Sequence, residues 1–173
     1  MPFHVDPIYA DMRSAALSLN DTDLPDLKGK RIFAALMESG FPEGAYTLVA
    51  AGDGSASLYI SNGGGLIGAG EHADVRSESL KVVAMAEDCL EHMKKVDSFP
   101  IVKPGNTTFY IPTADGVFGY TAKEEDLGER RDGKLSDLFH QCHALITAMR
   151  IADEEGRANQ DGDGESATSP ESR

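Results

Sequence analysis

Apolar residues at helical spacing predict four helices along this chain of 173 residues. The first begins at Asp6-Pro7, a typical helix start, and continues to about residue 19. The same spacing predicts further helices over residues 27–39, 73–96 and 135–152, with Gly40 ending the second. Because the apolar positions form stripes, we expect these helices to pack one side against another element.

Short apolar runs between turn residues predict five strands, over residues 46–50, 56–60, 65–70, 107–111 and 117–121. The first two are joined through Asp53-Gly54 and the last two through Asp115-Gly116, and both dipeptides are typical of tight hairpins. Asn62-Gly63-Gly64 supplies the turn into the third strand. The runs therefore predict a three-stranded antiparallel meander and a separate hairpin.

The order of these elements is α-α-β-β-β-α-β-β-α. It argues against a parallel, doubly wound sheet, in which single strands would alternate with helices. It predicts an α+β fold with helices packed on an antiparallel sheet of about five strands. In element order only, the pattern loosely resembles profilin-like and roadblock-like modules.

The two ends of the chain differ in character. Residues 1–152 contain all the predicted elements, and we expect them to form a single α+β domain. Residues 153–173 are acidic and have no bulky apolar side chain, so burial cannot offset the entropy lost on ordering them. This segment is predicted to be a disordered acidic tail.

Charge and composition narrow the classes of partner. With 16 basic and 29 acidic residues the net charge is −13, so the protein should repel nucleic-acid phosphates and anionic membranes. No apolar run is long enough to span a bilayer, and no signal peptide is predicted. Neither of the two cysteines belongs to a C-x-x-C pair, and we expect a cytoplasmic protein without a disulfide framework.

Seven glycines fall between Gly52 and Gly70, and they leave the third predicted strand nearly free of side chains. Residues 63–68 formally match the dinucleotide fingerprint G-x-G-x-x-G, but that fingerprint opens a helix directly, whereas the next helix is predicted only from residue 73. The acidic Glu71 and Asp74 at the helix start would also repel a phosphate. The segment is therefore predicted to be a crowded strand, and its binding candidates are Gly63, Gly64, Gly65, Gly68, Gly70, Glu71 and His72.

Cysteines and histidines on two predicted helices are the candidates for a metal site or a nucleophile, namely Cys89, His92, His140, Cys142 and His143. A zinc site can be drawn from such residues. Both cysteines, however, fall within apolar stripes, where a free cysteine usually packs as a small apolar side chain. We therefore predict no metal, no cofactor and no catalytic residue.

These patterns favour a non-enzymatic protein–protein interaction or regulatory module. Its partner would be a second copy of the chain or another protein, and an acidic inhibitor or immunity-type protein that masks a basic partner is one version. The alternative is a small-molecule or nucleotide binder, or an enzyme, that uses residues 63–70 with Glu71 and His72. The two hypotheses differ in whether the glycine strand packs within the sheet or lines an open cleft.

Overall fold

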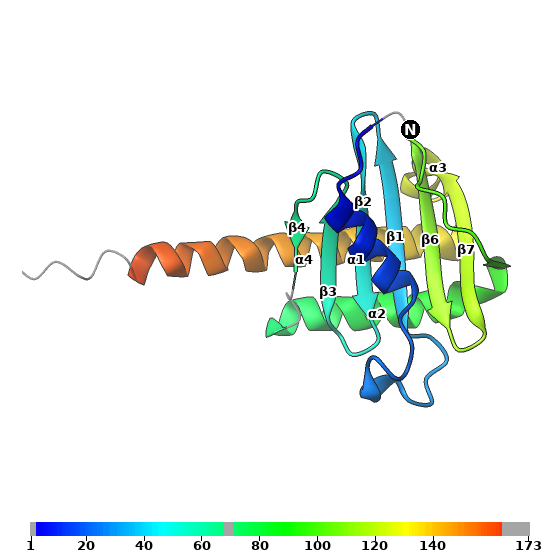
Figure 1. Ribbon diagram of the computed structural model, residues 1–173, viewed down its shortest axis with the longest axis horizontal. Coiled ribbons are helices and arrows are strands. Elements are labelled where there is room, and N and C mark those ends of the chain that lie inside the picture. The colour runs from blue at the N-terminus through cyan, green and yellow to red at the C-terminus, as the bar shows by residue number, and fades with distance from the viewer. Residues whose placement is uncertain (1–2, 68–70, 164–173) are drawn as a thin grey trace, which may run out of the picture.

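In the computed structural model, which describes residues 3–67 and 71–163, seven strands form one antiparallel sheet accompanied by four α-helices (Figure 1). The helices are α1 (Pro7–Leu17), α2 (Ala73–Cys89), α3 (Glu124–Gly128) and α4 (Gly133–Asp163), with two short 3-10 helices, η1 (Pro25–Leu27) and η3 (Leu90–His92). The strands are β1 (Ala34–Phe41), β2 (Gly44–Ala51), β3 (Ala56–Ile60), β4 (Gly65–Leu66), β5 (Lys94–Val96), β6 (Asn106–Thr113) and β7 (Gly116–Lys123). They lie in the order β4-β3-β2-β1-β6-β7-β5. The prediction of an α+β fold with an antiparallel sheet is confirmed, although the sheet has seven strands rather than about five.

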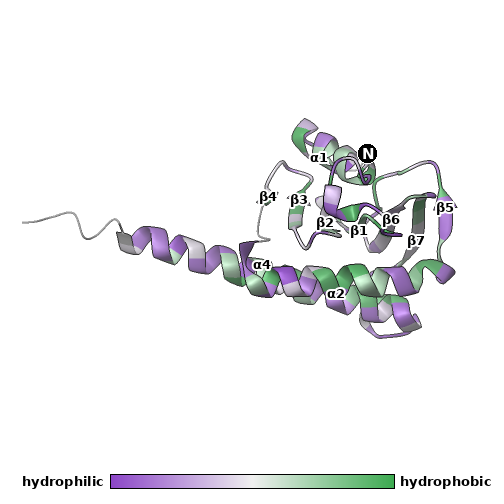
Figure 2. Cartoon of the chain, turned by 90° about the horizontal axis from the view of Figure 1, so that it is seen from below, coloured by the Kyte–Doolittle hydropathy of each residue, from purple (hydrophilic) through white to green (hydrophobic). Residues whose placement is uncertain are grey.

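Helices cover both faces of the sheet (Figure 2). α2 and α4 lie side by side on one face and run antiparallel, since Cys89 at the end of α2 contacts Lys134 at the start of α4. The main core lies between these helices and the sheet, and α4 contributes Leu138, Leu145 and Met149 to it. α1 lies on the opposite face above a smaller apolar cluster.

The helix predicted over residues 27–39 is wrong, because residues 34–41 form the strand β1 in the middle of the sheet. β1 lies between β2 and β6, and seven of its eight residues are buried. A strand that is covered on both faces carries apolar residues at almost every position, and such a run also satisfies helical spacing. The predicted order of elements is therefore wrong at its second helix.

Two other helices have ends that differ from the predictions. The helix predicted over residues 73–96 ends at Cys89, and the chain continues through η3 into the edge strand β5, which exposes Lys94 and Lys95. α4 does not stop near residue 152 but continues to Asp163, so the first part of the predicted tail is helical. The rest of that tail, residues 164–173, lies outside the described residues.

The predicted meander and the second hairpin are confirmed. β2 pairs with β3, and β3 pairs with β4 through Leu58↔Leu66 and Tyr59↔Gly65. β6 and β7 pair along their whole length. β4 covers only the first two residues of the predicted strand 65–70, of which residues 68–70 lie outside the described part of the chain. The meander brings the glycine segment to one edge of the sheet.

Candidate functional site

The candidate residues 63–72 lie where the chain leaves the sheet edge for α2. Gly63 and Gly64 belong to the turn between β3 and β4, and Gly65 is the first residue of β4. Glu71 is exposed, and His72 is the N-cap residue of α2, without a side-chain hydrogen bond to the helix. Gly68 and Gly70 lie outside the described residues. Gly65, Glu71 and His72 line one groove beside α4.

Atoms of this chain lie close to Gly63 and Gly65. A Cβ atom on Gly65 would collide with the carbonyl oxygen of Leu58 on β3, which is the neighbouring strand. Gly63 has a φ of +95°, and a Cβ atom there would lie 3.0 Å from the carboxylate carbon of Asp6. The Asp6 N–H donates a hydrogen bond of 2.8 Å to the Ser61 carbonyl oxygen, which holds the N-terminal segment against this turn. A tight turn and close strand pairing therefore account for Gly63 and Gly65.

Gly63, Gly64 and Gly65 do not open a helix, as they would in a dinucleotide-binding turn. Gly65 and Leu66 form a strand, and α2 begins only at Ala73. The first turn of α2 contains Asp74, whose carboxylate already complements the positive end of the helix dipole. This geometry differs from that of a phosphate cradle.

A groove of about 420 Å³ lies between β4 and α4, and we call it the edge groove. The apolar part of its lining comes from Leu66 and Ile67 at the end of the meander and from Met149 and Ala152 on α4. Ile67 is 68% exposed, the largest fraction among the large apolar side chains of the described residues. The polar part of its lining includes Glu71 and His72, so the groove joins these two candidate residues to a helix that is distant in sequence.

α4 continues well past the sheet edge at β4, as Figure 1 shows. We call residues 153–163 of α4 the overhang. Four of its residues line the edge groove, namely Asp153, Gly156, Arg157 and Gln160. The Arg157 Nε atom lies 3.2 Å from an Asp153 carboxylate oxygen, one helical turn away.

Sequence reasoning missed the overhang because it ended the last helix at residue 152. The apolar stripe stops there, and the residues that follow are polar, so burial gives no signal for a helix. The i, i+4 pair of Asp153 and Arg157 was the available signal, because such pairs stabilise helices.

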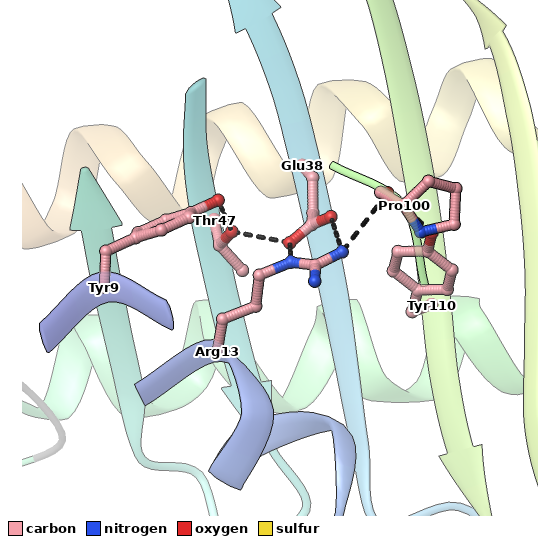
Figure 3. A network of polar contacts seen from close by, with 6 residues as sticks. All are labelled: Tyr9, Arg13, Glu38, Thr47, Pro100 and Tyr110. Atoms are coloured by element: carbon pink, nitrogen blue, oxygen red, sulfur yellow. Dashed lines mark hydrogen bonds and ion pairs between the residues drawn. The ribbon is translucent and has the colours of Figure 1, made fainter. Parts of the chain in front are cut away.

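On the opposite face of the sheet, a buried ion pair holds α1 (Figure 3). Arg13 on α1 donates two hydrogen bonds to the carboxylate of Glu38 on β1, from Nε at 2.6 Å and from Nη2 at 2.9 Å. The Glu38 side chain is fully buried, and that of Arg13 is 11% exposed. Arg13 Nη2 also donates to the Pro100 carbonyl oxygen at 3.3 Å. The pair therefore connects α1, the central strand and the loop that follows β5.

Hydroxyl groups complete this network. Thr47 donates a hydrogen bond of 2.7 Å to Glu38 Oε2, so it must accept the 2.8 Å hydrogen bond from the Tyr9 hydroxyl. Burial, with a contribution from the Glu38 carboxylate, raises the pKa of Tyr9 to about 12, so this hydroxyl stays protonated at neutral pH. The polar groups satisfy one another, which is the arrangement of a structural anchor.

The cysteines and histidines are spread over the helix layer. Both thiols are buried and free, and burial raises the pKa of Cys89 to about 11 and raises that of Cys142 as well. His140 lies 3.1 Å from the Gly128 carbonyl oxygen through Nε2, and His143 packs on the ring of Phe139. Burial and the neighbouring His140 lower the pKa of His143. Within residues 3–67 and 71–163, the structure shows no group of three or more His, Cys, Asp or Glu residues that could hold a metal ion.

We expect neither thiol to react with Ellman's reagent at pH 8 in the folded protein. The thiolate is the reactive form, and both the burial and the raised pKa values disfavour it. After unfolding in guanidinium chloride, both thiols should react rapidly. Rapid reaction of one thiol before unfolding would contradict the buried placement of Cys89 or Cys142, and single Cys→Ala variants would identify which.

None of the helices in the described part of the chain combines the length and the apolar character needed to cross a membrane. Comparison with known protein families found no family model that matches the chain, and comparisons with curated proteins and with solved structures found no match either. The resemblance to profilin-like and roadblock-like modules rested on the predicted element order, which is wrong at its second helix, so it is not supported.

Proposed function

We propose that this protein is a non-enzymatic protein-interaction module whose partner binds at the edge groove. The observation that carries the proposal is the overhang of α4, which continues past the edge of the sheet beside this groove. The buried ion pair and the two buried thiols are explained by packing and stability, and they offer no exposed reactive group.

A helix that leaves its domain lacks the packing that normally stabilises helices. Short helices are marginal in water by themselves, and the overhang contains Gly156 and Gly162, which cost about 1 kcal/mol each relative to alanine. A partner seated between the overhang and β4 would cover this helix and the exposed Ile67 together. Binding would therefore stabilise a segment that the domain leaves uncovered.

A small-molecule binder is the second candidate, and one observation favours it. Gly65, Glu71 and His72 line the same groove, whose volume of about 420 Å³ is within the range of ligand sites. The open position at the sheet edge and the exposed Ile67 favour a protein instead. The proposed location is the cytoplasm. The proposed partner is a second copy of the chain or another protein, such as a basic protein that this acidic chain would inhibit.

Affinity capture with three forms of the full chain tests the proposal. The wild type is compared with Ile67→Asp, which places a charge in the groove, and with Ile8→Asp, a matched change at an exposed position of α1. We expect at least one protein to be captured by the wild type and by Ile8→Asp but lost with Ile67→Asp. With the purified partner, Ile67→Asp should weaken binding at least tenfold, or about 1.4 kcal/mol.

Mass spectrometry of the same samples should include small molecules. A small molecule that is retained by the wild type and lost with Ile67→Asp, with no protein that behaves in this way, would support the second candidate and overturn the first. Equal capture of every protein by all three forms would contradict a role of the edge groove.

A further inference from the structure

We propose that the occupant of the edge groove is an extended, basic segment of a partner protein, which adds to the sheet as a strand beside β4. This inference rests on the proposed function and specifies the partner's class. It is carried by the open sheet edge, the length of the overhang and the charge around the groove.

The two edges of the sheet are built differently. β5 exposes Lys94 and Lys95, and lysines on an edge strand oppose the pairing of a further strand. β4 has no charged residue, and within the described residues its outer side is unpaired. An open edge of this kind offers backbone N–H and C=O groups to an extended peptide. The β4 edge, which is two residues long, therefore lacks the lysines that oppose pairing at the β5 edge.

The overhang has the length to cover added strands. It contains residues 153–163, and at about 1.5 Å per residue it is about 15 Å long. Neighbouring strands are about 4.8 Å apart, so this length corresponds to about three strand positions. α4 crosses the strands of the sheet as it runs toward this edge (Figure 1), so an added strand would lie over the overhang as β3 lies over the preceding turns.

The groove suits the side chains of a strand. In an extended segment, every second side chain points to the same face, and here one of them would meet the apolar lining of Leu66, Met149 and Ala152. Asp153, Gly156, Arg157 and Gln160 recur at helical spacing along the other wall. Gly156 leaves room there for the approach of a backbone, since nothing lies within 4 Å of the position of its missing Cβ atom.

Charge selects a basic segment over a second copy of the chain. Residues 153–161 contain four acidic residues and one arginine, a net charge of −3. Of the charged residues, Glu71, Asp153 and Arg157 line the groove itself. The whole chain has a net charge of −13. Two copies joined at β4 would bring these acidic surfaces together, and like charges repel. A partner with lysines or arginines would instead be attracted to the acidic surface and would associate faster.

A displayed library of random dodecapeptides, selected on the immobilised full chain, tests this inference. We expect the enriched peptides to have net positive charge and alternating apolar residues. Synthetic versions should bind at least tenfold more weakly to Ile67→Asp and equally well to Ile8→Asp. Their binding should slow amide hydrogen exchange at Gly65 to Ile67, because new strand pairing protects backbone amides.

Enriched peptides that are acidic, neutral or helical when bound would overturn the inference. So would an absence of enriched peptides, or a homodimer that Ile67→Asp dissociates in light scattering. In these cases the proposed function still stands if capture shows a protein, or a second copy, whose binding depends on Ile67. It fails together with the inference only if no Ile67-dependent protein is found by any of these measurements.

Discussion

Replacing Arg13 by alanine is expected to lower the free energy of unfolding by about 3–5 kcal/mol, because it leaves a buried carboxylate without its partner. Glu38 is fully buried at the centre of the sheet, and Arg13 supplies two of its three hydrogen bonds. Guanidinium chloride denaturation of the two proteins measures the difference. The matched control is Arg31→Ala, an exposed arginine outside the network, which should change stability by less than about 0.5 kcal/mol.

The double variant Arg13→Met with Glu38→Leu removes both charges. Its free energy of unfolding shows how much of the loss in Arg13→Ala comes from leaving Glu38 without a partner. Apolar side chains of similar size can replace a buried ion pair at little cost, so the double variant should recover most of the lost stability. A loss below about 1 kcal/mol in Arg13→Ala would show that water reaches Glu38 and would contradict its buried position.

Truncating Leu145 to alanine should cost about 2–5 kcal/mol, the usual range for a fully buried leucine. Leu145 lies on α4 and faces the main core, and its side chain is completely buried. Ile151 lies on the same helix but is 47% exposed, so Ile151→Ala is the matched control and should cost less than about 1 kcal/mol. Equal losses in the two variants would contradict the placement of Leu145 on the buried face of α4 and of Ile151 on its exposed face.

The sequence correctly predicted helices and strands that have one face in solvent. α1 starts at Asp6-Pro7 as predicted, and the hairpins form at Asp53-Gly54 and Asp115-Gly116. It failed at β1, because a strand buried on both faces has no alternation of apolar and polar residues. Residues 36 and 37 fit a helical stripe equally well, and only pairing with β2 and β6 decides between the two.

Only one wall of the candidate site was predicted, because only that wall has local signals in the sequence. Glycines and turn residues are local signals, so the segment at residues 63–72 could be found from the sequence. The other wall of the groove comes from α4, about 80 residues later, and its position depends on how the helix layer packs on the sheet. The Arg13–Glu38 pair was missed for the same reason, since the two residues meet only when α1 folds across β1.

The lysines of β5 also bear on how the proposed complex would assemble. A protein with two open sheet edges can join copies of itself or its partner end to end, and such contacts generate filaments. Here Lys94 and Lys95 oppose pairing at one edge, so only β4 is left to receive a strand. A complex of the proposed kind should therefore not extend from the β5 edge, so it can grow in one direction at most.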